Sequence, residues 1–236
     1  MNIHQSVIFP GEQVHFNESD ETQLRIGRGL TYFCTLRTLR ATQMGRLIQS
    51  GKKTFYIDYD CRKYTPVIGD SVIGQVMVKH AEGYKVDLCG TRLGQLGALA
   101  FENVTRKSRP NLQVGALIYA RVIYADKEIE PEIECTDGTD EKSSIFGELK
   151  GGFLIHGLSR SLCQKILDKN HPLLSTLGAS IPFEVAVGSN GRIWIHSKHV
   201  GITIALVQAI KKSESLNDND IIKICRETIK EVQKWL

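Results

Sequence analysis

The chain has 236 residues, 42% of them hydrophobic, which is enough for more than one packed unit. No stretch reaches the ~18 uninterrupted apolar residues of a membrane helix, and residues 1–6 lack the basic start and apolar run of a signal peptide. We therefore expect a soluble intracellular protein with no membrane segment. The net charge of +4 is too small by itself to indicate a polyanionic partner.

The distribution of charge along the chain says more than the total. Residues 79–121 hold seven Lys or Arg against three acids, whereas residues 126–148 hold nine acids against two Lys. This separation predicts a basic face for phosphates and an acidic face elsewhere. Two unrelated solvated surfaces would give the same pattern.

Residues 1–63 are predicted to form a small β domain. Turn signals at 9–11 and 27–29 separate short segments, and 54–59 is rich in aromatic and β-branched residues, as strands are. A few short strands bury little area, so we expect this domain to dock on a partner or on the next domain.

Residues 64–149 are predicted to form a five-stranded barrel of the OB type. The strand candidates lie at 67–78, 84–88, 94–101, 112–122 and 128–135, separated by turns. Gly74 and Ala120 occupy matching places in two of them, and a small residue inside a strand indicates a bend or a close approach of backbones.

Residues 150–236 mix the two periodicities and predict an α+β domain of the KH kind. Short strands are expected at 153–156, 183–187 and 192–196. Ser159 is expected to cap a helix that runs through Lys169, with Leu162, Ile166 and Leu167 on its apolar face. Further helices are predicted at 172–178, 200–212 and 220–235.

We find no motif for catalysis, a metal or a cofactor. The nucleophile elbow, the Walker loop, the H-E-x-x-H zinc motif and the Rossmann fingerprint are missing from the sequence. The six cysteines form no C-x-x-C pair and are expected to be free thiols. His196 and His199 are interpreted as surface or capping residues in preference to metal ligands.

Four glutamates, Glu128, Glu130, Glu132 and Glu134, alternate at a period of two, which places all four on one face of a strand. Clustered carboxylates can hold Mg²⁺ in a nuclease. A solvated outer face of an antiparallel barrel gives the same pattern and is far commoner.

The candidate RNA-binding residues follow the barrel. A compact basic loop contains Arg106, Lys107 and Arg109 and ends at a proline. Inter-strand loops and the face of strands two and three form the binding groove of OB barrels. Tyr84 and Lys85 are expected on strand two, to stack a base and meet phosphate, and Arg92 and Arg121 to extend the track. A loop that is merely solvated, or that contacts an acidic protein, is the alternative.

The tetrapeptide Gly188-Ser189-Asn190-Gly191 matches the G-x-x-G of KH domains, whose loop clamps nucleic-acid backbone. That loop joins two helices, whereas here alternating apolar segments flank the tetrapeptide and Asn-Gly favours a hairpin. We interpret it as a structural turn. Trp194 is expected to pack in the core or against the barrel.

Several runs together resemble a known family. They are "IFPGE" at 8–12, "YIDYDCRKYTPVIGDSVIG" at 56–74, "FENVTRKSRPNLQVGALIYARV" at 101–122 and "FEVAVGSNGRIWI" at 183–195. Over nearly the whole chain they resemble the cap subunit of the eukaryotic RNA exosome known as exosome component three. Ser108 stands where close relatives often have Asn.

This resemblance implies an N-terminal domain, an S1-type OB domain and a KH domain in a non-catalytic subunit. It implies single-stranded RNA, an RNase-PH-like ring, the other cap subunits and an associated 3′–5′ nuclease as partners, and no cofactor. Processing of RNA, rRNA included, and RNA degradation in the nucleus, nucleolus and cytoplasm are the expected setting. It assigns the basic loop to RNA and the G-x-N-G loop to packing. A free-standing RNA-binding regulator and a mainly structural clamp are the alternatives.

Overall fold

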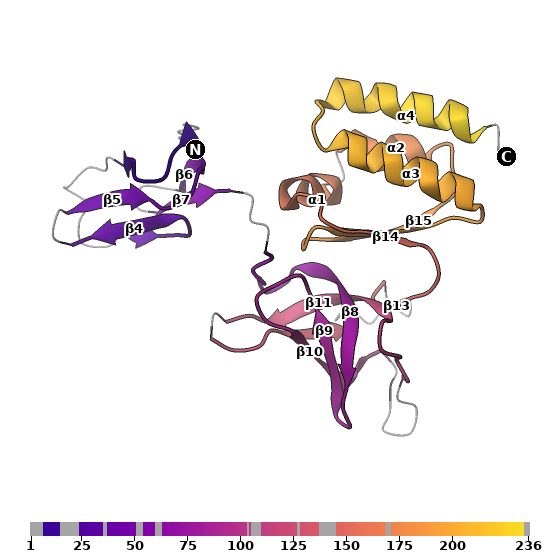
Figure 1. The fold of residues 1–236 in the computed structure, drawn as a ribbon, viewed down its shortest axis with the longest axis horizontal. Coiled ribbons are helices and arrows are strands. Elements are labelled where there is room, and N and C mark those ends of the chain that lie inside the picture. The colour runs from indigo at the N-terminus through magenta and orange to yellow at the C-terminus, as the bar shows by residue number, and fades with distance from the viewer. Residues whose placement is uncertain are drawn as a thin grey trace. The chain divides into compact units, whose positions relative to one another are not determined.

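The computed structural model describes residues 7–14, 24–34, 37–50, 54–59, 63–102, 104, 110–126, 128–136, 145–168 and 171–233 (Figure 1). The chain divides into two compact units, Met1–Cys61 and Arg62–Leu236. The predicted limit between residues 149 and 150 falls inside the second unit and stays a prediction. Within the described ranges, every helix is too short or too polar to cross a membrane.

The first unit consists of short strands, as predicted. One sheet has the order β1-β6-β7-β3 and the other the order β2-β5-β4. The strands are β1 (Val7–Ile8), β2 (Gln13–Val14), β3 (Arg25–Ile26), β4 (Leu30–Phe33), β5 (Thr38–Ala41), β6 (Gly45–Ser50) and β7 (Thr54–Asp58). Seven described apolar residues form its buried core, around the fully buried Leu39 and Ile57. A core of this size is small for a unit of some 60 residues.

The second unit begins with a closed five-stranded barrel, which confirms the predicted OB-type fold. Its strands are β8 (Ser71–Lys79), β9 (Gly83–Asp87), β10 (Gly94–Phe101), β11 (Leu117–Tyr124) and β12 (Glu132–Cys135). Around the barrel the order is β8-β9-β10-β12-β11, and the β11–β8 pairing closes it. A short strand, β13 (Gly147–Leu149), adds to the free side of β11.

The small residue inside β8 makes room for neighbouring side chains, whereas a bend or a close approach of another backbone was predicted. A Cβ on Gly74 would lie 2.2 Å from Cγ1 of Val86 on β9. Ile118, the β11 partner of Gly74, is fully buried beside it. Only a residue without a side chain lets the barrel wall close this tightly.

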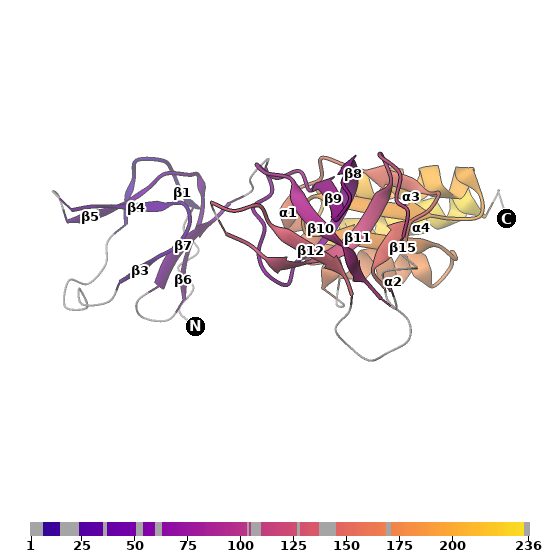
Figure 2. The same ribbon diagram turned by 90° about the horizontal axis from the view of Figure 1, so that it is seen from below.

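The rest of the second unit is the predicted α+β domain. The sheet order is β14-β16-β15, with the sheet between helices and barrel in Figure 1 and the barrel in front of the helices in Figure 2. Its elements are β14 (Phe153–Ile155), α1 (Arg160–Leu167), α2 (Pro172–Gly178), β15 (Glu184–Gly188), β16 (Arg192–His196), α3 (Val200–Ser213) and α4 (Asp218–Val232).

Helix α1 shows one confirmed prediction and one wrong one. The Oγ of Ser159 accepts a hydrogen bond from the Leu162 amide at 3.3 Å, so Ser159 is the N-cap. Leu167 is 43% exposed, although we predicted it on the buried face. Leu162, Cys163 and Ile166 fill that face, and Leu167 lies one position past the stripe.

Candidate nucleic-acid interface

Tyr84 is not a stacking platform, and this prediction was wrong. The residue is 4% exposed and belongs to the barrel core. The hydroxyl donates to the Pro110 carbonyl at 2.5 Å and accepts from the Leu112 amide at 3.3 Å. The side chain therefore anchors the segment after the basic loop to β9, and no base can reach its ring.

Lys85 lies on strand two of the barrel and points outward, as predicted. Its neighbours across the ladder are Val78 on β8 and Gln95 on β10. The Nζ is 2.9 Å from Oε1 of Glu130, and the Lys85 side chain is 35% exposed. A phosphate that approaches this ammonium must share it with a carboxylate or displace that carboxylate.

Arg121 does not extend the Lys85 track. It lies on β11, which is separated from β9 by β8 on one side and by β12 and β10 on the other. Its Nη2 is 2.6 Å from Oε1 of Glu134 on β12. The predicted continuity fails because the spatial order of barrel strands differs from their order along the chain.

Arg92 lies in the loop after β9, at the end of the barrel opposite the β8–β9 turn. It lines a pocket of about 290 Å³. The other lining residues are Thr65, Pro66, Thr91, Ala125, Asp126, Ile129 and Pro131. Arg92 can belong to one RNA track with the β8–β9 end of the barrel only if that RNA crosses the whole β9–β10 face.

The predicted basic loop, Arg106, Lys107 and Arg109, lies outside the described residues. The residues after it are described: Pro110 accepts from Tyr84, and the Lys79 Nζ donates to the Asn111 side chain. Both contacts are at the β8–β9 end of the barrel. The described chain from Pro110 onward therefore lies beside Tyr84 on β9.

The four glutamates do not share one strand face, which corrects another prediction. Strand β12 begins at Glu132, because the segment that contains Pro131 precedes the ladder. Glu130 turns to Lys85 and Glu134 to Arg121. Within the described residues, two ion pairs therefore join the acidic segment to the basic one.

The Gly188–Gly191 tetrapeptide forms a hairpin turn, as predicted. Gly188 pairs with Arg192 across β15 and β16, which leaves a loop of three residues. Only Gly191 has a positive φ, +77°, and Asn190 does not use the positive φ that Asn-Gly allows. A three-residue hairpin loop needs a single left-handed residue at its end, which explains the difference.

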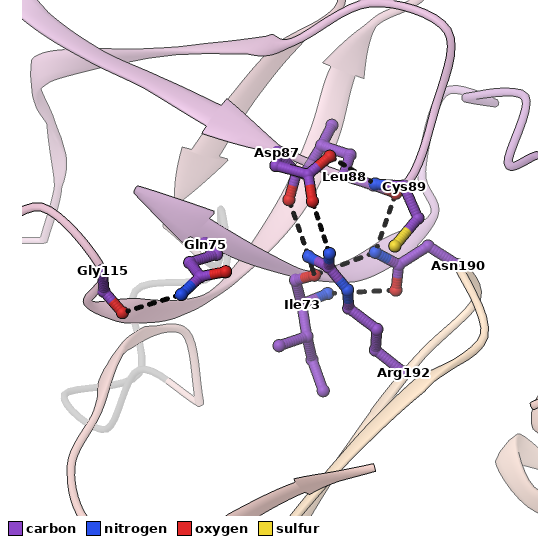
Figure 3. Close-up of polar contacts among 8 residues, drawn as sticks. All are labelled: Ile73, Gln75, Asp87, Leu88, Cys89, Gly115, Asn190 and Arg192. Atoms are coloured by element: carbon purple, nitrogen blue, oxygen red, sulfur yellow. Dashed lines mark hydrogen bonds and ion pairs between the residues drawn. The ribbon is translucent and has the colours of Figure 1, made fainter. Parts of the chain in front are cut away.

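The tip of this hairpin is buried in the wall of the barrel (Figure 3). The Asn190 Nδ2 donates to the carbonyls of Ile73 at 2.8 Å and Leu88 at 3.1 Å, and its Oδ1 accepts from the Ile73 amide at 3.3 Å. The Ser189 amide donates to the Ser71 carbonyl at 2.8 Å. A loop that is 5% exposed at Ser189 and Asn190 cannot clamp a nucleic-acid backbone.

Arg192 and Asp87 complete this contact, and sequence reasoning missed both. The Arg192 Nη1 donates to the Asp87 carbonyl at 2.7 Å, and Nη2 forms an ion pair with the Asp87 carboxylate (Figure 3). The Arg192 side chain is 7% exposed. A charged residue directly after a predicted Asn-Gly turn is expected to be solvent-exposed. The only signal of burial in the sequence is the apolar run Ile193–Ile195 that follows it.

Trp194 packs against the barrel, one of the two predicted places. It forms a buried cluster with Ile73, Tyr119 and Ala186. Its Nε1 donates to the Gly151 carbonyl at 2.9 Å, so the indole satisfies its one polar group. Barrel and KH-like sheet therefore share an apolar contact next to the hydrogen-bonded hairpin tip.

Comparisons with known proteins agree with this architecture. Residues 64–147 match the family model "Exosome complex component RRP40, S1 domain", and residues 152–201 match a KH domain model. The exosome complex component rrp40 of Schizosaccharomyces pombe is 46% identical over 96% of both chains. The chain belongs to the Rrp40 family of exosome complex components.

Two further proteins are similar to this Rrp40 family member at lower sequence identity. The exosome complex component RRP40 of Saccharomyces cerevisiae is 36% identical over 95% of this chain and 96% of its own. A crystal structure of a candidate exosome complex RNA-binding protein matches with a TM-score of 0.58 at 22% identity. It covers 72% of this chain and 99% of its own, and at that identity it supports the fold alone.

Proposed function

We propose that this chain is a non-catalytic, RNA-binding cap subunit of the RNA exosome, a 3′–5′ exoribonuclease complex that processes RNA, rRNA included, and degrades it. The observation that carries the proposal is the match over nearly the full length to exosome complex component rrp40. An S1 barrel joined to a KH domain supports it, because both are modules that contact single-stranded RNA.

The proposed RNA contact is the outer face of β9 and β10. Lys85 projects from this face, and we assign Arg106, Lys107 and Arg109, which come before Pro110 in the chain, to the same RNA contact. Such contacts are made to phosphates and carry little sequence information. We assign the KH hairpin, including Asn190, to holding the barrel in place, because its polar groups are already used there.

The proposed partners are the RNase-PH-like ring subunits, the other cap subunits and the associated 3′–5′ nuclease. In this arrangement the chain stabilises the ring and guides single-stranded RNA toward the channel. The proposed location is the nucleus, including the nucleolus, and the cytoplasm, where RNA processing and degradation take place.

Affinity purification of the tagged full chain from its own cells tests membership. We expect co-purification of ring and cap subunits in stoichiometric amounts. A chain that elutes from size exclusion of cell extract only as a monomer contradicts membership and supports a free-standing RNA-binding regulator instead.

Charge reversal of Arg106, Lys107 and Arg109 to Glu separates RNA contact from a purely structural clamp. RNA affinity should fall while assembly persists. Unchanged RNA affinity with weakened assembly would assign the loop to a protein neighbour.

A further inference from the structure

We propose that the outer face of the sheet β2-β5-β4, in the first unit, is a second binding site for single-stranded RNA. A base lies there against the ring of Phe33, and its phosphate binds the guanidinium of Arg40. The site rests on the proposed function and deepens it. It lies wholly in the first unit and is separate from the proposed contact on β9 and β10.

Register and burial decide which side chains share this face. On β5, Leu39 and Ala41 are buried in the core of the first unit, so their neighbours along the strand point to the other side of the sheet. Residues directly opposite one another across a ladder point to the same side. The register of the three strands then gives the members of the outer face, which are Gln13, Thr31, Phe33, Thr38 and Arg40.

Phe33 and Arg40 lie together on this face. Phe33 is the last residue of β4 and is 43% exposed, although it is apolar. The guanidinium carbon of Arg40 lies 5.6 Å from the centroid of the Phe33 ring, and this cation–π contact holds the arginine beside the ring. Aromatic rings on a sheet and guanidinium groups are the surfaces on which proteins stack the unpaired bases of single strands.

Arg40 forms no ion pair within the described residues, so its charge is available to an anion from outside the unit. The described part of the first unit contains two acids, and both are bound elsewhere. Asp58 pairs with Arg28 at 3.6 Å, and the Glu12 carboxylate accepts a hydrogen bond from the Phe9 amide at 3.0 Å.

Two polar atoms of this face have no hydrogen-bond partner although solvent does not reach them. They are Oγ1 of Thr38 and Nε of Arg40, two positions apart on β5. Buried polar groups are nearly always paired. A phosphate that binds the guanidinium side-on accepts from Nε, and the Thr38 hydroxyl can donate to the same group. Both residues are partly exposed, so binding requires only a rotation of their side chains.

The composition of the face favours RNA over a protein as the occupant. Four of its five side chains are polar, and Phe33 is the apolar one. The buried core of a protein interface is about two-thirds apolar. Hydroxyl, amide and guanidinium groups are instead the usual donors to the phosphate and sugar oxygens of nucleic acids.

Two measurements on the full chain locate the site. Fluorescence anisotropy of a labelled oligouridine, titrated at several salt concentrations, gives the affinity and the slope of log affinity against log salt. Ultraviolet crosslinking of the same RNA, followed by trypsin digestion and mass spectrometry, identifies the peptides that touch it. Trypsin cleaves after Arg28 and Arg37, so we expect a crosslink in the peptide of residues 29–37, which contains Phe33.

The variants separate stacking from charge. Phe33→Leu should lower affinity roughly five- to thirtyfold at every salt concentration, because the ring is lost, whereas Phe33→Tyr keeps a ring and should bind as the unchanged chain does. Arg40→Gln should reduce the salt slope by about 0.7, the value for one phosphate contact on a single strand. Arg25→Gln, an exposed arginine of β3 on the other sheet, is the matched control and should leave the slope unchanged.

Three results would overturn the inference. If Phe33→Leu and Arg40→Gln bind RNA as the unchanged chain does, and no crosslink falls within residues 29–37, the RNA lies elsewhere and the proposed function stands. If both variants keep RNA affinity but lose co-purifying subunits, the face is a protein interface. If the unchanged chain binds no RNA, the proposed function itself fails.

Discussion

The Nζ of Lys85 on β9 lies 2.9 Å from Oε1 of Glu130 in the loop before β12, and both side chains are about one-third exposed (35% and 36%). A cation that is already paired is a weaker partner for phosphate than a free one. In the proposed RNA contact, this pair limits how strongly Lys85 can bind a phosphate.

Glu130→Gln should strengthen RNA binding. The change removes both the competing carboxylate and its repulsion of phosphate. A pair this exposed is worth ~0.2–1 kcal/mol, so we expect affinity to rise by a factor between about 1.4 and 5. Anisotropy titration at physiological salt measures it. Glu128→Gln removes the same charge from the same loop and leaves the Lys85–Glu130 pair in place, so it controls for general charge. Equal gains in both variants would contradict a specific role for Glu130.

Asn190→Ala should loosen the contact between barrel and KH domain. The change leaves the buried carbonyls of Ile73 and Leu88 without their Asn190 donor, which costs about 2–4 kcal/mol. Denaturant unfolding of the full chain measures the loss. A free energy of unfolding within ~0.5 kcal/mol of the unchanged chain would mean that the Asn190 side chain contributes nothing to this contact.

Gly188→Ala should be destabilising, although it adds one methyl group. A Cβ at this position would lie 2.3 Å from Oδ1 of Asn190 and 2.9 Å from the Ile73 amide nitrogen. The hairpin tip must shift out of the barrel wall, at a cost of about 1–3 kcal/mol. Gly178→Ala is the matched control, since a Cβ there meets nothing within 4 Å. Thermal unfolding of the two variants should separate them clearly, and equal midpoints would contradict the close fit.

The buried thiols should make the protein less stable at high pH. Burial raises the pKa of Cys135 and of Cys163 to about 12, from an ordinary value of 9.0. Between these values the unfolded chain loses protons that the folded chain keeps. The free energy of unfolding therefore falls as pH rises above 9 and is unaffected by these groups below it.

Alkylation checks the same feature directly. Iodoacetamide at pH 8 should label the exposed Cys34 quickly, and Cys135 and Cys163 only after unfolding. Mass spectrometry of the digested protein locates the label. Rapid labelling of Cys135 in the folded chain would show that the barrel core opens readily.

The sequence predicts strand limits well where apolar and polar side chains alternate. The segment 94–101 was predicted with the limits of β10, because Leu96 faces inward between exposed neighbours. The same alternation could have corrected the prediction for Tyr84. Tyr84, Val86 and Leu88 share one face of the strand and all are buried, so Lys85 must point outward and Tyr84 cannot.

Other features of the site depend on which strands and domains are neighbours in space, and a single sequence does not contain that information. Arg121 is paired with Glu134 because β11 and β12 are adjacent, on a side of the barrel away from Lys85. Arg192 is buried because the hairpin enters the wall of another domain. Local pattern predicts a turn at Gly191 but cannot say what the turn touches.

We propose that this chain binds RNA without cutting it. Purified full-length chain should be titrated with labelled single-stranded RNA over a range of salt concentrations, and the same RNA examined by gel after incubation with Mg²⁺. We expect weak binding that falls as salt rises, and RNA of unchanged length. No binding at low salt, or a ladder of shortened RNA, would contradict the claim.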